Sequence, residues 1–205
     1  TNHGLAFGLN ALVNQASSDW IVRMDADDYS RRDRLEKINE YLLTSEKIDV
    51  VGSFMSEFSR DVETLSRTIR YPLSNEEMRK AFCYRNPLSH ASAAINKSFF
   101  KKAGQYPYVS VTNEDTYLWL SGFNTGCQFA NIPDDLYYAR FDESTLGRRN
   151  RSRKIISDCI DRLRVIIDLN GSVFSGFVVI SYALLSLLPG SHVLRKLYFW
   201  MLSKK

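Results

Sequence analysis

The chain has 205 residues, of which 44% are hydrophobic and 24% charged, a composition that suits one globular domain and excludes a disordered chain. Its net charge of +4 is mild and concentrated in the last third, which argues against a general polyanion binder and against nucleic acid as a partner. The cysteines Cys83, Cys127 and Cys159 form no CxxC pair, so the sequence predicts neither a disulfide framework nor a zinc site and favours a reducing compartment.

The first elements in chain order alternate between helix and strand. Apolar residues at helical spacing predict a helix that begins near the amino terminus: Leu5, Leu9, Leu12, Val13 and Ala16. The run "WIVRM" (residues 20–24) predicts a buried strand. A helix is expected over residues 30–43 with Leu35, Ile38, Tyr41 and Leu42 inward, and a strand over residues 48–55. This order is typical of an α/β sheet.

The middle of the chain continues the alternation. Ser74 with Glu77 has the spacing of a capping box and predicts that a helix starts there. A small-residue strand is expected over residues 91–95, then a short helix from Ser98 that stops at Gly104. The segment 112–122 predicts a helix with Leu118 and Trp119 towards the core, and "CQFANIP" (127–133) and "LYYARF" (136–141) predict two strands.

Three carboxylates, Asp25, Asp27 and Asp28, directly follow the first predicted strand in "MDADDYS". Carboxylates this close repel one another unless the loop is solvated, hydrogen-bonded or holding a cation. In α/β sheets, ligands bind beyond the carboxyl ends of the strands, where this loop is expected to lie. The alternative from the residues alone is an acidic turn that caps the next helix.

Five motifs occur in one order over the first part of the chain: "NHGLAFGLNAL" (2–12), "RMDADDYSRRDRLEK" (23–37), "NPLSHASAAINKSFFKKAGQY" (86–106), "NEDTYLWL" (113–120) and "YYARFDES" (137–144). Together they resemble the bacterial family 2 glycosyltransferases of cell-surface polysaccharide assembly. The resemblance implies the α/β GT-A fold, a Rossmann-like mixed sheet that binds nucleotide-diphospho-sugars. The expected partial GT-A domain covers residues 1–147.

The resemblance places the family's DxD element on Asp25 and Asp27. It implies that Asp27 ligates Mn²⁺ or Mg²⁺ and that Asp25 is a second metal or donor contact. A hard divalent cation takes oxygen ligands and neutralises the charge of the departing nucleoside diphosphate. Asp28 is a weaker candidate because a capping role suits it equally. Asn2 and Gly4, in the first motif, are expected at the nucleotide-sugar donor, with a UDP-sugar as the default.

The resemblance places the general base of an inverting transfer on Asp115, with Glu114 in support. A base must lie within hydrogen-bond reach of the acceptor hydroxyl. From the residues alone, the two carboxylates could merely complement a helix N-terminus.

His90 and Arg140 are further candidates for contacts to the donor. Family members place a His near the acceptor or pyrophosphate, but a lone His is equally a structural group. Guanidinium groups match phosphate oxygens, so Arg140 could cover the leaving diphosphate together with the basic run Arg148, Arg149 and Arg151. The QxxRW motif of processive members is absent, which favours addition of a single sugar.

Residues 148–205 predict a helical, membrane-associating tail. The segment 170–194 contains no Asp, Glu, Lys or Arg, but its most apolar part is shorter than the roughly 20 residues of a spanning helix and ends at Pro189. Aromatic and basic residues follow, the pattern of an interfacial helix. This favours a peripheral or monotopic protein on the cytoplasmic face of the inner membrane, with a lipid-linked or saccharide acceptor.

Family members begin with a strand, a "PxYN"-like turn and a "DDGS"-like turn, and nothing of that kind precedes Thr1. The resemblance therefore predicts an N-terminally truncated domain, and these 205 residues alone are expected to be inactive. Two other classes stay open at this stage. One is a non-catalytic, membrane-associated remnant or binding module. The other, weaker one is a DxD phosphohydrolase with Asp25 as nucleophile.

Overall fold

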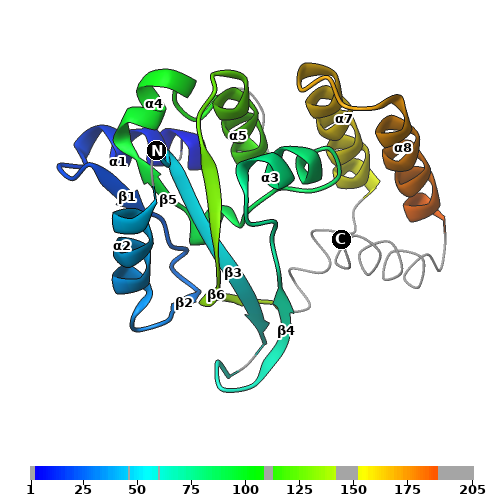
Figure 1. Cartoon of the computed structure of the whole chain (residues 1–205). Coiled ribbons are helices and arrows are strands. Elements are labelled where there is room, and N and C mark those ends of the chain that lie inside the picture. Colours follow the sequence, from blue (N-terminus) through cyan, green and yellow to red (C-terminus); the bar gives the residue numbers. More distant parts are fainter. Residues whose placement is uncertain (1–2, 46, 60, 109–112, 142–151, 189–205) are drawn as a thin grey trace.

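The computed structural model describes residues 3–45, 47–59, 61–108, 113–141 and 152–188. Helices and strands alternate along the chain, as the sequence predicts (Figure 1). In order they are α1 (Leu5–Gln15), β1 (Trp20–Val22), β2 (Tyr29–Ser30), α2 (Arg34–Thr44), β3 (Val50–Phe58), β4 (Leu65–Ile69), α3 (Asn75–Phe82), the 3-10 turn η1 (His90–Ser92), β5 (Ala94–Asn96), α4 (Lys97–Ala103), α5 (Glu114–Asn124), β6 (Phe129–Arg140), α7 (Ser152–Asp168) and α8 (Val173–Leu187).

One mixed sheet runs through the molecule in the order β1-β5-β3-β6-β2, with β4 paired to β3. The two long strands, β3 and β6, are parallel, and the other pairs are antiparallel. The parallel pair extends from Val50 beside Phe129 to Phe58 beside Arg140. The carboxyl ends of β3 and β6 therefore lie together, and β2 pairs with β6 next to that end.

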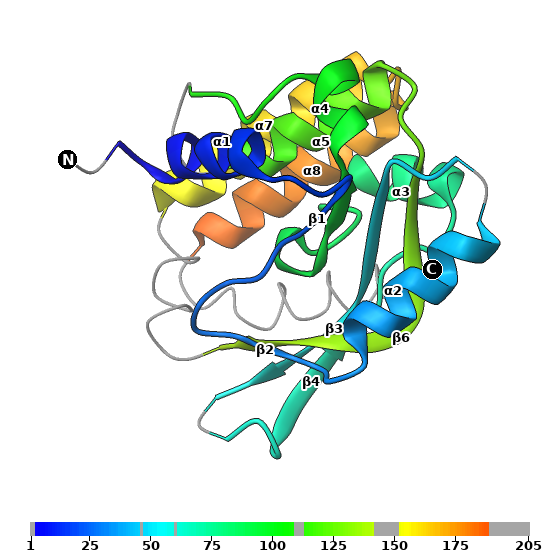
Figure 2. The ribbon, with the colours of Figure 1, turned by 90° about the vertical axis from the view of Figure 1, so that its left-hand side faces the viewer.

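Helices cover both faces of this sheet because successive strand residues point to opposite sides. Val50 packs into the main core with side chains from α3, α4 and α5, whereas Val51 packs against Ile38 of α2 on the other face. Figure 2 shows α2 crossing β3 and β6 on one side, with α1, α4 and α5 grouped away from it. This three-layer arrangement is the α/β fold that the sequence predicts.

Several local predictions are confirmed. Ser74 accepts the Glu77 backbone N–H, and the Glu77 side chain accepts the Ser74 backbone N–H, so α3 starts with a complete capping box. Leu118 and Trp119 of α5 are buried in the main core. Both features depend on residues close together in the chain, which is why the sequence alone reveals them.

The predicted inward face of α2 is partly wrong. Leu35 is 65% exposed, whereas the neighbouring Arg34 is only 2% exposed. The Arg34 Nη2 donates to the Arg23 carbonyl at 2.9 Å, and the guanidinium lies over the Tyr137 ring at 5.0 Å. The helix is turned so that this cation, rather than Leu35, lies beneath the loop after β1. Ile38 is buried as expected.

Two further differences concern the strands and the first helix. The predicted strands 127–133 and 136–141 are one strand, β6, because the pairing with β3 continues past Pro133 with a shift in register. β4, which the sequence analysis missed, pairs with β3 at the sheet edge. In α1, Leu5 and Leu12 are exposed, while Asn10 is buried and bonds both the backbone N–H and the carbonyl of Tyr106.

The helices α7 and α8 pack on the side of the sheet that carries α3 and α5. Val165 and Leu169 of α7 are members of the main core. The Tyr84 and Ser175 hydroxyls are 2.7 Å apart, which ties α8 to the segment after α3. The predicted domain boundary between residues 147 and 148 lies outside the described residues.

Candidate active site

The acidic loop, residues 23–28, connects β1 to β2, and each of its three carboxylates has a different environment. Asp25 forms a two-point ion pair with Arg23, at 2.6 and 3.0 Å. Asp28 accepts the Tyr137 hydroxyl at 2.6 Å and the Arg140 backbone N–H at 2.7 Å. Each oxygen of these two carboxylates therefore accepts one hydrogen bond from the protein.

Asp27 differs from its neighbours. Its side chain is exposed, and within the described part of the chain its carboxylate oxygens accept no hydrogen bond. Only its backbone carbonyl is used, by the Arg140 Nε at 3.2 Å. The Arg140 guanidinium also lies over the Phe58 ring at 4.9 Å. An exposed carboxylate to which the described residues donate no hydrogen bond, next to an oriented guanidinium, can take a cation and the phosphates bound to it.

The neighbouring carboxylates of the acidic loop affect the pKa of Asp28. Burial raises the pKa of Asp28, and the charges of Asp25 and Asp27 raise it further, while the bonds from Tyr137 and Arg140 lower it. A cation bound by the loop would reduce the repulsion between these carboxylates.

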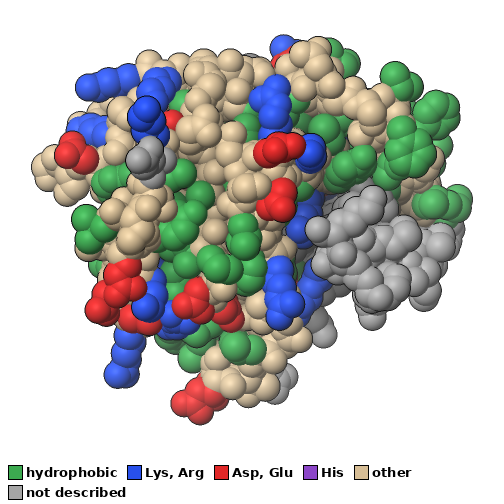
Figure 3. All heavy atoms as spheres, in the orientation of Figure 1, with side chains coloured by type: hydrophobic (Ala, Val, Ile, Leu, Met, Phe, Trp, Pro, Cys, Tyr) green, Lys and Arg blue, Asp and Glu red, His purple; other side chains and the backbone are tan. Residues whose placement is uncertain are grey.

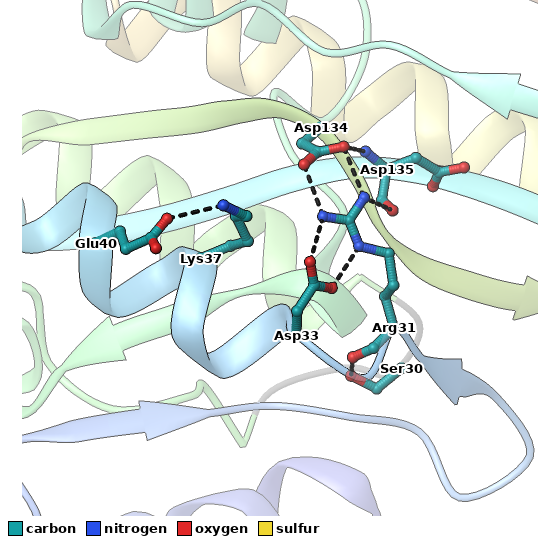
Figure 4. Close-up of polar contacts among 7 residues, drawn as sticks. All are labelled: Ser30, Arg31, Asp33, Lys37, Glu40, Asp134 and Asp135. Carbon is teal, nitrogen blue, oxygen red and sulfur yellow. Dashed lines mark hydrogen bonds and ion pairs between the residues drawn. The ribbon is translucent and has the colours of Figure 1, made fainter.

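The guanidinium group of Arg31 anchors the segment that follows the acidic loop. Arg31 donates to Asp33 at the start of α2 and to Asp134 of β6, as Figure 4 shows, with the closest Asp134 contact at 2.7 Å. The Arg31 backbone N–H also donates to the Leu136 carbonyl at 3.1 Å. The loop is therefore anchored to β6 on both sides of Tyr29.

Asp115 lies in the first turn of α5 and is directed towards Asn86. Its Oδ2 accepts the Asn86 Nδ2 at 2.7 Å, and its Oδ1 accepts the Thr116 backbone N–H at 2.8 Å. Burial raises the pKa of Asp115, and the charge of Glu114 raises it further. A carboxylate of raised pKa that stays hydrogen-bonded in its ionised form has the properties of a general base.

His90 lies between aromatic side chains. Its Nε2 is 2.8 Å from the Tyr106 hydroxyl, and its ring meets the edge of Trp119 at 5.7 Å. Burial lowers the pKa of His90 well below its usual value, and the charge of Arg23 lowers it further, so the ring is neutral.

The pKa of the Tyr106 hydroxyl depends on charges from two parts of the site, Arg23 of the acidic loop and the carboxylates at the start of α5. Burial raises the pKa of its hydroxyl, Arg23 lowers it, and Asp115 and Glu114 raise it. Arg23 of the acidic loop and the two carboxylates at the start of α5 therefore all act on the Tyr106 hydroxyl.

Comparisons with known proteins show the family of the chain. The family model described as "Glycosyl transferase family 2" matches residues 1–104, which include the acidic loop and His90. The chain belongs to glycosyl transferase family 2. Asp115 and Arg140 lie beyond the matched residues.

Two curated relatives of this family 2 chain are bacterial glycosyltransferases. An "Uncharacterized glycosyltransferase" of Haemophilus influenzae is 29% identical over 99% of this chain and 75% of the relative. The "UDP-Gal:alpha-D-GlcNAc-diphosphoundecaprenol beta-1,3-galactosyltransferase" of Escherichia coli is 29% identical over 77% of this chain, which spans only 56% of that relative.

A solved structure shows the same fold. The "Mannosyltransferase PcManGT from Pyrobaculum calidifontis in complex with GDP-Man and Mn2+" superposes with a TM-score of 0.56 at 14% identity, over 98% of this chain and 65% of that one. At this identity the likeness concerns the fold alone. The chain thus has the GT-A fold that the sequence predicts.

The family 2 chain fits a divalent cation through Asp27 rather than through a cage of protein ligands. Among the described residues, no group of three or more His, Cys, Asp or Glu side chains is arranged to hold a metal ion. Mg²⁺ and Mn²⁺ at phosphate sites need only one or two carboxylates, because phosphates and waters complete the coordination. Asp27 could meet that need, and Asp25, whose side chain is 44% exposed, keeps lone pairs that Arg23 does not use.

Three residues of the site escaped the sequence analysis as functional candidates: Asn86, Tyr137 and Arg34. Asn86 and Tyr137 each begin a motif that was recognised, so the motifs themselves were the available signal. Arg34 looked like a surface residue of an amphipathic helix, and no local pattern marks it as buried. Gly4 precedes α1 with φ of 87°, a conformation that suits glycine, and Asn2 lies outside the described residues.

Proposed function

We propose that this chain carries the metal-binding loop and the base of an enzyme that transfers a sugar from a nucleotide diphosphate donor to a hydroxyl group of a lipid-linked or saccharide acceptor, in surface polysaccharide or lipopolysaccharide assembly. The observation that carries the proposal is Asp27, an exposed carboxylate without a hydrogen bond among the described residues, in the acidic loop that is anchored to β6. The proposal takes its reaction class from the family to which the chain belongs.

Asp27 would hold Mn²⁺ or Mg²⁺, with Asp25 as a second contact. When bound, the cation would neutralise charge on the diphosphate as the sugar leaves. Arg140 would contribute a second positive group on the same side, since its Nε is already directed at the Asp27 carbonyl. A UDP-sugar is the default donor, and the names of the relatives support UDP or GDP as the nucleotide to test first.

Asp115 would take the proton from the acceptor hydroxyl, with Glu114 beside it. Transfer in one displacement, with the acceptor oxygen opposite the leaving diphosphate, inverts the anomeric centre. Burial raises the pKa of Asp115, which makes it a stronger proton acceptor than a solvated carboxylate. His90, neutral and bonded to Tyr106, would shape the acceptor side of the site without carrying charge.

The membrane surface is the proposed location of the chain. Val173, Phe174 and Phe177 of α8 are 81%, 72% and 70% exposed, and Figure 3 shows hydrophobic side chains gathered on the side where Figure 1 places α8. An open apolar groove of about 440 Å³ lies between α7 and α8, with Ile167 and Ile180 in its lining. An exposed patch of this kind marks an interaction surface.

The occupant that fits this patch is the lipid bilayer. α8 contains no charged residue, and the sequence after it, residues 191–205, combines lysines and arginines with aromatic residues. Cations suit anionic headgroups and aromatic rings suit the interfacial region. Within the described residues, every helix is too short or too polar to cross a bilayer, so the proposed contact is with one face.

A nucleoside diphosphate release assay tests the function. The protein would be incubated with UDP-, GDP- and dTDP-sugars, Mn²⁺ and a polyprenyl-diphosphate-linked saccharide. Release that requires both the acceptor and Mn²⁺, with a glycosylated product seen by mass spectrometry, supports the proposal. Absence of nucleotide binding at every Mn²⁺ concentration would contradict it and favour a non-catalytic binding module.

A further inference from the structure

Side chains of the helix α7 form hydrogen bonds with the start of α5, where Asp115 lies. Asp161 of α7 is only 6% exposed and accepts the Tyr117 hydroxyl at 2.6 Å as well as the Asn113 Nδ2. Asp158, one turn earlier, also accepts the Asn113 Nδ2, at 3.0 Å. A buried carboxylate with these partners holds two residues that flank the proposed base.

Arg162, the next residue of α7, reaches the other side of the same helix start. It donates to the Phe82 carbonyl at 3.0 Å and to the Asn86 Oδ1, and its second nitrogen is 3.4 Å from the Thr116 Oγ1. Its guanidinium lies over the Phe82 ring at 5.2 Å. The planar fork is therefore fixed in direction by contacts at several points.

The Asn86 amide links Arg162 to Asp115 by hydrogen bonds at its two ends. Its Oδ1 accepts from Arg162 and from the Thr116 hydroxyl, the latter at 3.0 Å, so its Nδ2 faces the Asp115 carboxylate at 2.7 Å. An amide has one accepting end and one donating end. If the amide turned over, its NH₂ group would face the Arg162 donors and its oxygen would face the Asp115 carboxylate.

We propose that Arg162 is a positioning residue for Asp115, acting through the Asn86 amide. This inference rests on the proposed role of Asp115 as the base. It makes α7 part of the catalytic apparatus, although the sequence analysis places it in a separate tail. Arg162 keeps the carboxylate pointing in one direction and does not itself need to touch the acceptor.

The charges around Asp115 give this arrangement a measurable signature. Glu114 raises the pKa of Asp115, whereas Arg162 and Lys154 of α7 lower it. Tyr106, on the segment after α4, lies in the field of both carboxylates. Lys154 also pairs with Asp158 at 2.8 Å. Removal of the Arg162 charge and of the fixed Asn86 donor should both act in one direction, towards a higher pKa for Asp115.

The test compares Arg162→Met, Arg162→Lys and Asn86→Ala in the full chain, with Arg164→Met as the matched control. Arg164 lies on the same helix, is exposed and pairs with Asp168 at 3.1 Å, so its loss changes charge without reaching Asn86. The first readout is a pH titration of the Asp115 carboxyl carbon by ¹³C NMR, assigned by its absence in Asp115→Asn. Circular dichroism verifies that each variant is folded.

Arg162→Met and Asn86→Ala should each raise the measured pKa of Asp115 by about one unit, Arg162→Lys should move it less, and Arg164→Met should leave it in place. With a donor that the parent uses, Arg162→Met should lower kcat by about 10-fold or more, because a misdirected base affects the chemical step while the donor KM changes little. Arg162→Lys should recover part of the loss.

An unchanged Asp115 pKa in a folded Arg162→Met or Asn86→Ala variant would overturn the positioning role. If Asp115→Asn itself keeps the parent turnover, the proposed base is wrong. If Asp115→Asn loses turnover while Arg162→Met retains it, the base stands and only the role of Arg162 fails. The NMR titration needs no substrate, so it decides the inference even before a donor is identified.

Discussion

Tyr137 joins the acidic loop to β6 through a single hydroxyl group, which donates to Asp28 at 2.6 Å and accepts the Asp25 backbone N–H at 3.0 Å. Tyr137 is fully buried, and its ring lies beneath Arg34. One oxygen on the central sheet therefore fixes two of the three acidic positions. Asp27, which lies between them in sequence, is held in place by the same geometry.

Tyr137→Phe should destabilise the fold and loosen the acidic loop. The lost hydrogen bond reaches a half-buried carboxylate, so we expect the free energy of unfolding to fall by about 1–3 kcal/mol in urea denaturation. Affinity for UDP with Mn²⁺ should fall as well. Tyr138→Phe is the control, because the Tyr138 hydroxyl makes no hydrogen bond within the described residues. Equal losses in both variants would contradict the anchoring role.

Asp27→Asn should remove Mn²⁺-dependent binding of UDP or GDP, measured by isothermal titration calorimetry. An amide is a poor substitute for a carboxylate as a ligand of a hard cation. Asp19→Asn is the matched control, since Asp19 is also exposed but lies at the opposite end of β1. Binding that is equal in the Asp27 variant and the parent, with or without a chelator, would exclude the metal role.

Asp115→Asn should lower turnover by a factor of about 10² or more and leave donor affinity nearly unchanged, because a missing base affects the chemical step. Glu114→Gln should have a smaller effect, since Glu114 acts on the site through its charge. Steady-state kinetics and calorimetry on the same preparations separate the two quantities. A collapse of donor affinity would instead make Asp115 a binding or structural residue.

The stability of the protein should also report the raised pKa of Asp115. In the unfolded chain the carboxyl ionises at a lower pH than in the folded protein, so folding loses stability as pH rises through that interval. Asp115→Asn cannot ionise. The variant should therefore gain stability relative to the parent as pH increases from about 4 to about 7. A difference in unfolding free energy that is constant across this range would show that the pKa is not raised.

Phe174→Gln combined with Phe177→Gln should reduce binding to vesicles that contain anionic lipid by about 10-fold or more, because each buried aromatic side chain contributes roughly 1.5–3 kcal/mol. Leu43→Gln is the control, a 78% exposed apolar residue on α2 at the other face of the sheet. Vesicle flotation at low and high salt provides the measurement. Complete release by salt would mean that basic residues alone hold the protein to the membrane.

The sequence by itself determined those features that depend on neighbours along the chain. The alternation of apolar runs indicated the α/β class, the spacing of Ser74 and Glu77 marked the start of α3, and the strand before Asp25 placed the acidic loop at a strand end. Periodicity, caps and turns depend on local interactions, so they can be recognised from the sequence alone.

Only the tertiary structure decided which carboxylates of the acidic loop are hydrogen-bonded by the described residues and which is not. Asp25, Asp27 and Asp28 look alike in sequence, but Arg23 pairs with the Asp25 carboxylate, and Tyr137 and the Arg140 backbone N–H bond that of Asp28. The Asp27 carboxylate accepts no hydrogen bond among the described residues. The contact of Asn86 with Asp115 spans 29 residues, and that of Arg162 with Asn86 spans 76. Such contacts arise from packing of whole elements, and no local pattern encodes them.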